Sequence, residues 1–272
     1  MALAALDQDT PRAAVPALKA ATAAAVPHDL VVTGMSKRFG KGRPVLNGFS
    51  LKVPRGQSLA IIGANGTGKS TLLRCCLRLI EPDSGDVELL KHNVARAKLR
   101  ELRRLRARIG FVFQRHNLVP RLSALSNVLH GALARGGGPS CWHQAAAPAR
   151  LRGEAMACLD RVGLAHAAAQ RADQLSGGQS QRVAIARMLM QRPELVMADE
   201  PVASLDPIAG EEVMALLCDL MRDQGLTLVF TTHHLDHALQ YGDRIVGMRH
   251  GRVELDSPTR GLRAAELEGV YG

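Results

Sequence analysis

Residues 58–71, SLAIIGANGTGKST, carry the strongest indication of the fold of this chain. The stretch begins with an apolar run of the kind that forms a buried strand of a parallel sheet. The pattern GxxxxGK[ST] follows, in which glycines let backbone N–H groups curl around phosphates. A helix expected from Lys69 to Ile80 comes next, with its positive end toward the same phosphates. A strand, a glycine-rich loop and a helix in this order predict a nucleotide-binding α/β domain.

The loop supplies the first candidate binding residues. Lys69 is expected to reach the β and γ phosphates of a nucleotide, and Ser70 is expected to ligate Mg²⁺. The candidate ATP-binding residues of this loop are Gly63, Ala64, Asn65, Gly66, Thr67, Gly68, Lys69, Ser70 and Thr71. ATP and Mg²⁺ are therefore the expected ligands.

A second apolar run, residues 195–198, ends in two acids, Asp199 and Glu200. An acid at the carboxyl end of a strand can hold Mg²⁺, and the next carboxylate can polarise an attacking water. The alternative is a pair of exposed acids in a turn before Pro201. With the phosphate loop present, Asp199 is the candidate metal ligand and Glu200 the candidate catalytic base.

Residues 175–179, LSGGQ, precede a run with apolar residues at helical spacing over 181–190. Ser-Gly-Gly is also ordinary loop composition, since glycine supplies positive φ and serine caps helices. At the start of a helix, however, Ser176 and the N–H groups of Gly177 and Gly178 form a second anion site. The chain thus offers two phosphate-binding surfaces.

Taken in order, these motifs resemble the ATPase subunits of the ATP-binding cassette (ABC) family over about residues 30–262. The resemblance implies a P-loop NTPase (RecA-like) α/β core. It also implies an antiparallel β-subdomain from residues 30–60 and 86–90, and a helical signature subdomain near 120–190. We expect an ABC ATPase domain over 29–262 and a short tail over 263–272. The alanine- and proline-rich residues 1–28 are expected to form a disordered extension.

The family resemblance also assigns roles to matched positions. Gln114 would ligate Mg²⁺ and approach the attacking water, His233 would hold the γ-phosphate, and both join Glu200 as catalytic candidates. Phe39 would stack on adenine, with Phe49 as the alternative, and His234 is the alternative to His233. The remaining matched positions are the D-loop residue Asp206 and the signature, Leu175, Ser176, Gly177, Gly178 and Gln179.

Partners and cargo follow from the same resemblance. Two copies pack head to tail in the family, so that each site takes its signature from the other copy. The chain would lie peripherally at the cytoplasmic face of the inner membrane and drive integral membrane permease subunits, served by a periplasmic or extracellular solute-binding protein. Residues 114–123 and 127–131 resemble the phosphonate-importer branch, so phosphonate, phosphite or a phosphate ester is the expected cargo. A polar amino acid importer and a soluble assembly-factor ATPase are the alternatives.

The composition argues against a membrane-spanning segment and against a zinc site. Hydrophobic residues make up 46% of its 272 residues, and no run of about 18 uncharged apolar residues predicts a membrane span. The five cysteines lack zinc-binding spacing and are expected to be reduced thiols.

Much of the net charge of +10 lies within residues 91–108, which carry a single acid, Glu101. Only 3% of residues are aromatic, so no platform for stacking bases is predicted, and nucleic acid is not an expected partner. A solvated helical face near anionic lipid headgroups is favoured.

Overall fold

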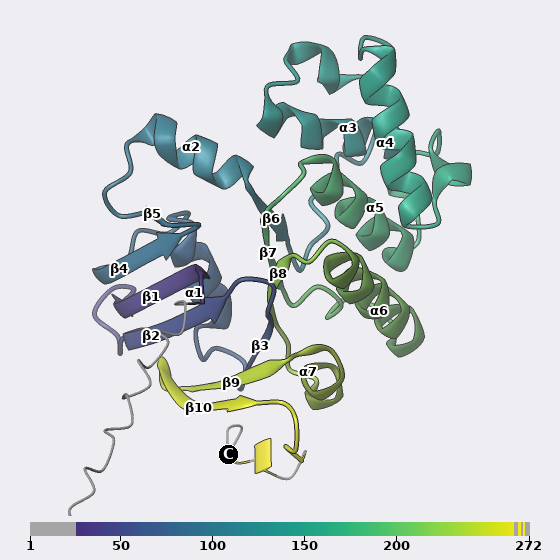
Figure 1. The fold of residues 1–272 in the computed structure, drawn as a ribbon. Helices are drawn as coiled ribbons and strands as arrows, with labels where there is room; N and C mark the ends of the chain where they lie inside the picture. Colours follow the sequence, from purple (N-terminus) through teal and green to yellow (C-terminus); the bar gives the residue numbers. More distant parts are fainter. Residues whose placement is uncertain (1–25, 264–265, 268, 270–272) are drawn as a thin grey trace, which may run out of the picture.

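The computed structural model describes residues 26–263, 266–267 and 269. The extension expected over 1–28 and the tail expected over 263–272 therefore lie largely outside the described residues. The described part contains two sheets, with helices packed around and between them (Figure 1).

The larger sheet has six strands in the order β10-β9-β3-β8-β7-β6. Neighbouring strands are parallel, except that β10 runs antiparallel to β9. The strands are β3 (Ser58–Ile62), β6 (Ile109–Val112), β7 (Leu195–Asp199), β8 (Thr227–Thr231), β9 (Arg244–Arg249) and β10 (Arg252–Pro258). Parallel strands bring their carboxyl ends to one edge, so the segments after β3, β6, β7 and β8 are neighbours in space.

The alternation of side chains along β3 divides the interior into two cores. Leu59 and Ile61 join the core that contains the second sheet, whereas Ala60 and Ile62 join the core that contains most of the helices. Both faces of the central strands are covered, which explains why their sequences are apolar runs without alternation.

The smaller sheet is antiparallel, with the order β2-β1-β4-β5. Its strands are β1 (His28–Lys37), β2 (Leu46–Pro54), β4 (Ser84–Leu89) and β5 (His92–Asn93). The expected antiparallel β-subdomain is confirmed, but the range 30–60 extends too far, because residues from Ser58 onward pair in the larger sheet.

A helical part lies on the far side of the larger sheet from β1, β2 and β4 (Figure 1). It contains α3 (Ala124–Leu129), α4 (Ala149–Arg161) and α5 (Gly177–Met190), with 3₁₀ turns at His130–Arg135, Pro139–Trp142, Ala165–Ala167 and Ala172–Gln174. The helical signature subdomain expected near 120–190 is thus present.

The helix after the phosphate loop, α1 (Lys69–Cys76), is shorter than expected. Ile80 lies outside it because the chain turns at Arg78, whose φ is 52°. The Arg106 guanidinium donates to the carbonyls of Leu77 at 2.9 Å and of Arg78 at 2.6 Å, so the turn is held by a distant side chain.

The remaining helices are α2 (Leu99–Ala107), α6 (Pro207–Asp223) and α7 (Leu235–Tyr241). In α2, Leu102 and Leu105 are buried, while Arg100, Arg103 and Arg104 are exposed and make no ion pair with the described residues. All five cysteines are buried as free thiols. None of the described helices combines the length and apolarity needed to traverse a bilayer.

Candidate functional site

The phosphate loop joins β3 to α1 and depends on glycine at two positions. Gly63 has φ 147°, and a Cβ there would lie 2.4 Å from the carbonyl oxygen of Met248. Gly68 has φ 103°, and a Cβ there would lie 2.7 Å from the carbonyl oxygen of Val45. The Thr67 hydroxyl donates to the Ala64 carbonyl at 2.8 Å, which closes the loop on itself. The predicted loop is therefore held in a conformation that few other sequences can adopt.

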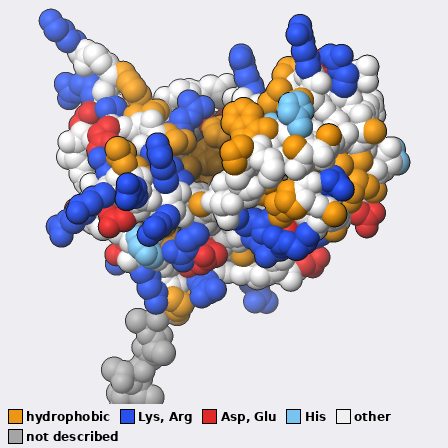
Figure 2. All heavy atoms as spheres, turned by 90° about the horizontal axis from the view of Figure 1, so that it is seen from above, with side chains coloured by type: hydrophobic (Ala, Val, Ile, Leu, Met, Phe, Trp, Pro, Cys, Tyr) orange, Lys and Arg blue, Asp and Glu red, His pale blue; other side chains and the backbone are white. Residues whose placement is uncertain are grey.

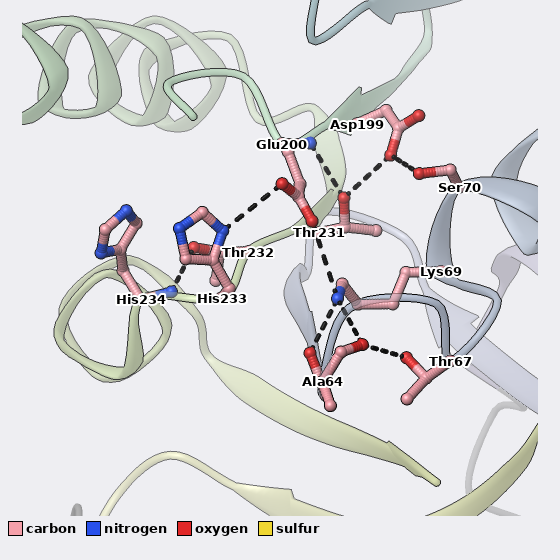
Figure 3. A network of polar contacts seen from close by, with 11 residues as sticks. Ala64, Thr67, Lys69, Ser70, Asp199, Glu200, Thr231, Thr232, His233 and His234 are labelled. Atoms are coloured by element: carbon pink, nitrogen blue, oxygen red, sulfur yellow. Dashed lines mark hydrogen bonds and ion pairs between the residues drawn. The ribbon is translucent and has the colours of Figure 1, made fainter. Parts of the chain in front are cut away.

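Lys69 is buried beneath this loop, with 4% of its side chain exposed. Its ammonium donates to the carbonyls of Gly63 at 2.7 Å and Ala64 at 3.3 Å, and it lies 3.6 Å from Oε1 of Glu200 (Figure 3). Burial lowers the pKa of Lys69, and the charges of Glu200 and Asp199 oppose that shift. The ammonium is therefore poorly solvated and suited to exchange its carbonyl partners for phosphate oxygens.

Asp199 ends β7 and is held from three directions. The Ser70 hydroxyl donates to its Oδ1 at 2.7 Å, and the Thr231 hydroxyl donates to the same oxygen at 3.2 Å. Nη2 of Arg74 lies 3.5 Å from Oδ2. The two residues predicted to ligate Mg²⁺ from different motifs are thus in direct contact.

Glu200 follows Asp199 in an unusual backbone conformation. Its φ is 45°, in the left-handed region, and its N–H donates to the Thr231 hydroxyl at 2.9 Å. Its two carboxylate oxygens lie 3.6 Å from the Lys69 ammonium and 3.4 Å from Nδ1 of His233 (Figure 3). A left-handed glutamate that is fixed from three sides is a strained residue of the kind found in active sites.

The two candidate histidines take different positions. His233 follows β8 and turns its ring toward Glu200, whereas the ring of His234 lies on the far side of His233 from that carboxylate (Figure 3). Burial and the neighbouring histidines lower the pKa of His234. The geometry supports His233 as the residue near the reacting phosphate.

Gln114 lies two residues beyond β6, at the sheet edge where β7 and β8 also end. Its side chain is exposed and makes no hydrogen bond with the described residues. The sheet brings it to the expected edge, and its predicted contact with Mg²⁺ remains a prediction.

The signature begins α5. Ser176 caps the helix by accepting from the N–H of Gln179 at 3.2 Å, and the Gln179 side chain accepts from the N–H of Ser176 at 2.9 Å. Asp206 caps α6 in the same way, through the N–H of Ala209 at 3.0 Å. A Cβ on Gly177 would lie 3.1 Å from the Leu205 side chain, so the signature packs against the D-loop.

Within one chain the signature and the phosphate loop remain apart. They lie at α5 and α1, which Figure 1 places in separate parts of the molecule, and among the described residues no hydrogen bond or ion pair joins them. Ser176 and Gly177 are exposed, as are Asp206 and Ile208. The signature, which is predicted to be the second phosphate-binding surface, therefore faces outward.

The two candidate aromatic residues differ in exposure. Phe39 follows β1 and is 52% exposed, with the Lys37 ammonium 5.5 Å from its ring centroid. Phe49 is 1% exposed, within the core beneath the smaller sheet. Only Phe39 of this pair offers a ring face to adenine.

The prediction from sequence missed two residues that organise the site. Thr231 joins Asp199 to the backbone of Glu200, and its only signal was a position at the end of an apolar strand. Arg187, on α5, donates to the carbonyls of His116 at 2.9 Å and Asn117 at 2.7 Å, and so ties the signature helix to the segment that follows Gln114. Nothing local in the sequence indicates these partners.

Known proteins are similar to this chain over most of its length. A family model described as ABC transporter matches residues 46–203. The chain is 46% identical to phosphonates import ATP-binding protein PhnC 1 of Ruegeria sp. (strain TM1040), over 89% of this chain and 94% of that protein. It is 48% identical to the phosphonates import ATP-binding protein PhnC of Bordetella parapertussis, over 89% and 96% of the two chains. It is also 48% identical to the phosphate-import ATP-binding protein PhnC of Mycolicibacterium smegmatis, over 89% and 91%.

Solved structures agree with these matches. The dimeric ATP-binding cassette MJ0796, bound to ADP and Pi after hydrolysis, has a TM-score of 0.73 and 34% identity, over 86% of this chain and 100% of that one. The cbiO1 protein of Clostridium perfringens, part of the cbiONQ transporter complex, has a TM-score of 0.76 and 30% identity, over 89% and 92%.

Proposed function

The chain belongs to the ABC transporter family, and from that premise we propose that it is the ATP-hydrolysing subunit of an importer for phosphonates or a related phosphorus oxyanion. The observation that carries the proposal is the similarity to phosphonate import proteins over 89% of the chain, which includes both the ATP site and the helical part. We propose a peripheral position at the cytoplasmic face of the inner membrane, where ATP is available.

Inorganic phosphate is the second candidate cargo. The relative from Mycolicibacterium smegmatis is named for phosphate import and is as similar to this chain as the phosphonate protein of Bordetella parapertussis. Phosphonate, phosphite and phosphate are all tetrahedral phosphorus oxyanions. The relatives named above give no support to the polar amino acid alternative.

The site geometry supports a separate role in hydrolysis for each of three residues. Lys69 would exchange the carbonyls of Gly63 and Ala64 for the β and γ phosphates. Glu200 would orient the attacking water and accept its proton, and His233, 3.4 Å from Glu200, would fix the γ-phosphate beside it. Catalysis in this arrangement is mainly positioning and charge neutralisation.

The residues present fit a magnesium ion. Ser70 Oγ and Asp199 Oδ1 are hard oxygen donors that already lie 2.7 Å apart, as two ligands of one small cation do. They would hold the ion, with Gln114 as the expected further ligand. Bound Mg²⁺ would neutralise the charge that develops on the phosphates.

A complete site would need a second copy of the chain. The signature is exposed and separated from its own phosphate loop, and Ile208, beside the D-loop, is 76% exposed. A head-to-tail dimer would bring Ser176 and Gly177 of one copy to the phosphates bound by the other, at the positive end of α5. The dimeric state of the similar cassette MJ0796 supports this arrangement.

A groove beside Gln114 is suited to the membrane subunits. It has a volume of about 380 Å³ and lies between α2 and the helical part, where Figure 2 shows a hollow with orange apolar atoms and blue basic side chains around it. Its lining includes Leu79, Arg106, Phe111, Phe113, His130 and Met188. An amphipathic helix with acids beside its apolar face fits this surface. Arg187 would transmit movement there to α5, because it holds the neighbouring carbonyls.

Reconstitution tests the proposed function. The chain is coexpressed with the products of its neighbouring genes, and ATPase activity in proteoliposomes is measured with methylphosphonate, phosphite, phosphate or glutamine. Stimulation by a phosphorus oxyanion is expected. Stimulation by glutamine alone would contradict the cargo, and failure to copurify with membrane subunits would favour the soluble assembly-factor alternative.

A further inference from the structure

Four aromatic rings form a column that begins at the ATP site and ends on α7. The ring centroids of His233 and His234 are 4.1 Å apart, and those of His234 and His237 are 5.0 Å apart. The ring of Tyr241 meets His237 edge-on at 6.1 Å. The planes of the two histidine pairs are tilted by 37° and 49°, and aromatic rings in tilted contact at these separations attract one another. The column gives His233 a stacking partner on the side away from Glu200 (Figure 3).

One carboxylate on α6 anchors the far end of the column. Oε2 of Glu211 lies 3.2 Å from Nε2 of His237, and Oε1 accepts from the Tyr241 hydroxyl and, at 3.0 Å, from the Gln240 amide. Burial raises the pKa of Tyr241, and the hydrogen bond that its hydroxyl donates to Glu211 acts in the same direction. Three side chains of α7 thus share one acceptor on α6, which fixes α7 relative to the helix behind the site.

His237 is the member of the column that connects the anchor to the stack. Its side chain is 13% exposed, and its Nδ1 is buried without a hydrogen-bond partner among the described residues. Its orientation is therefore set by Glu211 on one nitrogen and by the rings on its two sides. His233 itself is 37% exposed and follows a strand end, and the column contacts its ring on the side away from Glu200, where it restricts the rotation of the ring.

We propose that His237 is a positioning residue for ATP hydrolysis: tied to Glu211 and stacked through His234, it holds the ring of His233 against Glu200. The inference rests on the proposed role of His233 at the ATP site. Hydrolysis requires the γ-phosphate, the water and the base to be aligned, and a small rotation of His233 disturbs that alignment. His237 contacts neither Glu200 nor the phosphate loop and acts only through the stack.

The test follows the His233 ring directly. The full chain is labelled with ¹³C-histidine, and the resonance of His233 is identified among the ten histidines by its loss in His233→Gln. His237→Ala is expected to shift and broaden that resonance. Glu211→Ala removes no ring but releases His237, Gln240 and Tyr241 from α6, so it is expected to shift the resonance too. His237→Phe restores a ring at the same position, and Glu211 still holds α7 through Gln240 and Tyr241 in this variant, so the resonance is expected to return near its original place.

Kinetics of the same variants complete the test. In His237→Ala, kcat is expected to fall about two- to tenfold while the Kd for ATP stays unchanged, and His237→Phe is expected to recover most of kcat. A His233 resonance that does not move in His237→Ala would overturn the proposal, even if kcat falls, and so would a moved resonance with unchanged kcat. An unchanged kcat in His233→Ala would instead refute the role of His233 in hydrolysis. The resonance measurement does not test that role, so the two failures can be told apart.

Discussion

The hydroxyl of Ser70 lies 2.7 Å from Oδ1 of Asp199, although the two residues are 129 positions apart in the chain. Ser70 belongs to the helix after β3, and Asp199 ends β7. Strand β8 lies between β3 and β7 in the sheet, and its Thr231 hydroxyl donates to the same oxygen of Asp199. One sheet edge thus assembles the metal-binding and phosphate-binding groups that the sequence distributes over three segments.

Glu200→Gln is expected to retain ATP binding and to lower turnover by about 100-fold or more, because the substitution removes the base and leaves the phosphate loop intact. The variant is also expected to accumulate as an ATP-bound dimer. ATPase assays and size-exclusion chromatography with ATP measure both effects. Glu254→Gln, at an exposed position on β10, is the matched control. If Glu200→Gln hydrolysed ATP at the rate of the control, Glu200 would not be the catalytic base.

Lys69→Ala is expected to weaken ATP binding by about 10- to 150-fold, since a charge-assisted hydrogen bond contributes about 1.5–3 kcal/mol. Equilibrium binding of a fluorescent ATP analogue measures the change. Lys52→Ala removes an exposed lysine of β2 and is expected to bind normally. Equal affinities for the two variants would count against the phosphate loop.

His233→Ala is expected to reduce kcat by about 100-fold or more, because His233 is the histidine that contacts Glu200. His234→Ala removes only a stacking partner and is expected to cost no more than about tenfold. Steady-state ATPase rates compare them, with the exposed His143→Ala as control. A larger loss in His234→Ala would reverse the assignment.

The exposed arginines of α2 are expected to bind anionic vesicles. Cosedimentation with phosphatidylglycerol vesicles should exceed that with phosphatidylcholine vesicles and fall as salt rises, since the attraction is electrostatic. Replacing Arg100, Arg103 and Arg104 with Glu should abolish the difference. Binding that survives this replacement would show that these side chains are not the contact.

The parts of the fold that the sequence predicted are those with local signals. The strand, loop and helix of the phosphate site come from one short stretch of sequence, residues 58–71. The predicted C-terminal end of α1 was wrong, because a distant side chain holds the turn that follows this helix. Arg106 donates to the carbonyls of Leu77 and Arg78, which lie 29 and 28 residues before it in the chain.

The same distinction holds at the site. Lys69, Ser70, Asp199 and Glu200 were predicted from motifs and come together in the structure. Thr231 and Arg187 were missed because their partners lie 31 to 71 residues away, where only the tertiary fold places them. The burial of Phe49 is likewise a property of the packed core, and it leaves Phe39 as the exposed ring.

If each ATP site is shared between two copies, two variants that are inactive by themselves restore each other's activity when they are mixed. Lys69→Ala disables the phosphate loop, and Ser176→Asp places a carboxylate against the γ-phosphate while keeping a good cap for α5. Each variant alone is expected to be inactive at an ATP concentration that saturates the unaltered chain but lies below the Kd of Lys69→Ala. If the sites are shared, a mixed dimer contains one intact site, so ATPase activity should return on mixing. A double variant carrying both changes, mixed with Lys69→Ala, is the control and should stay inactive. If the two single variants remain inactive when mixed, although they form mixed dimers, the shared site is contradicted.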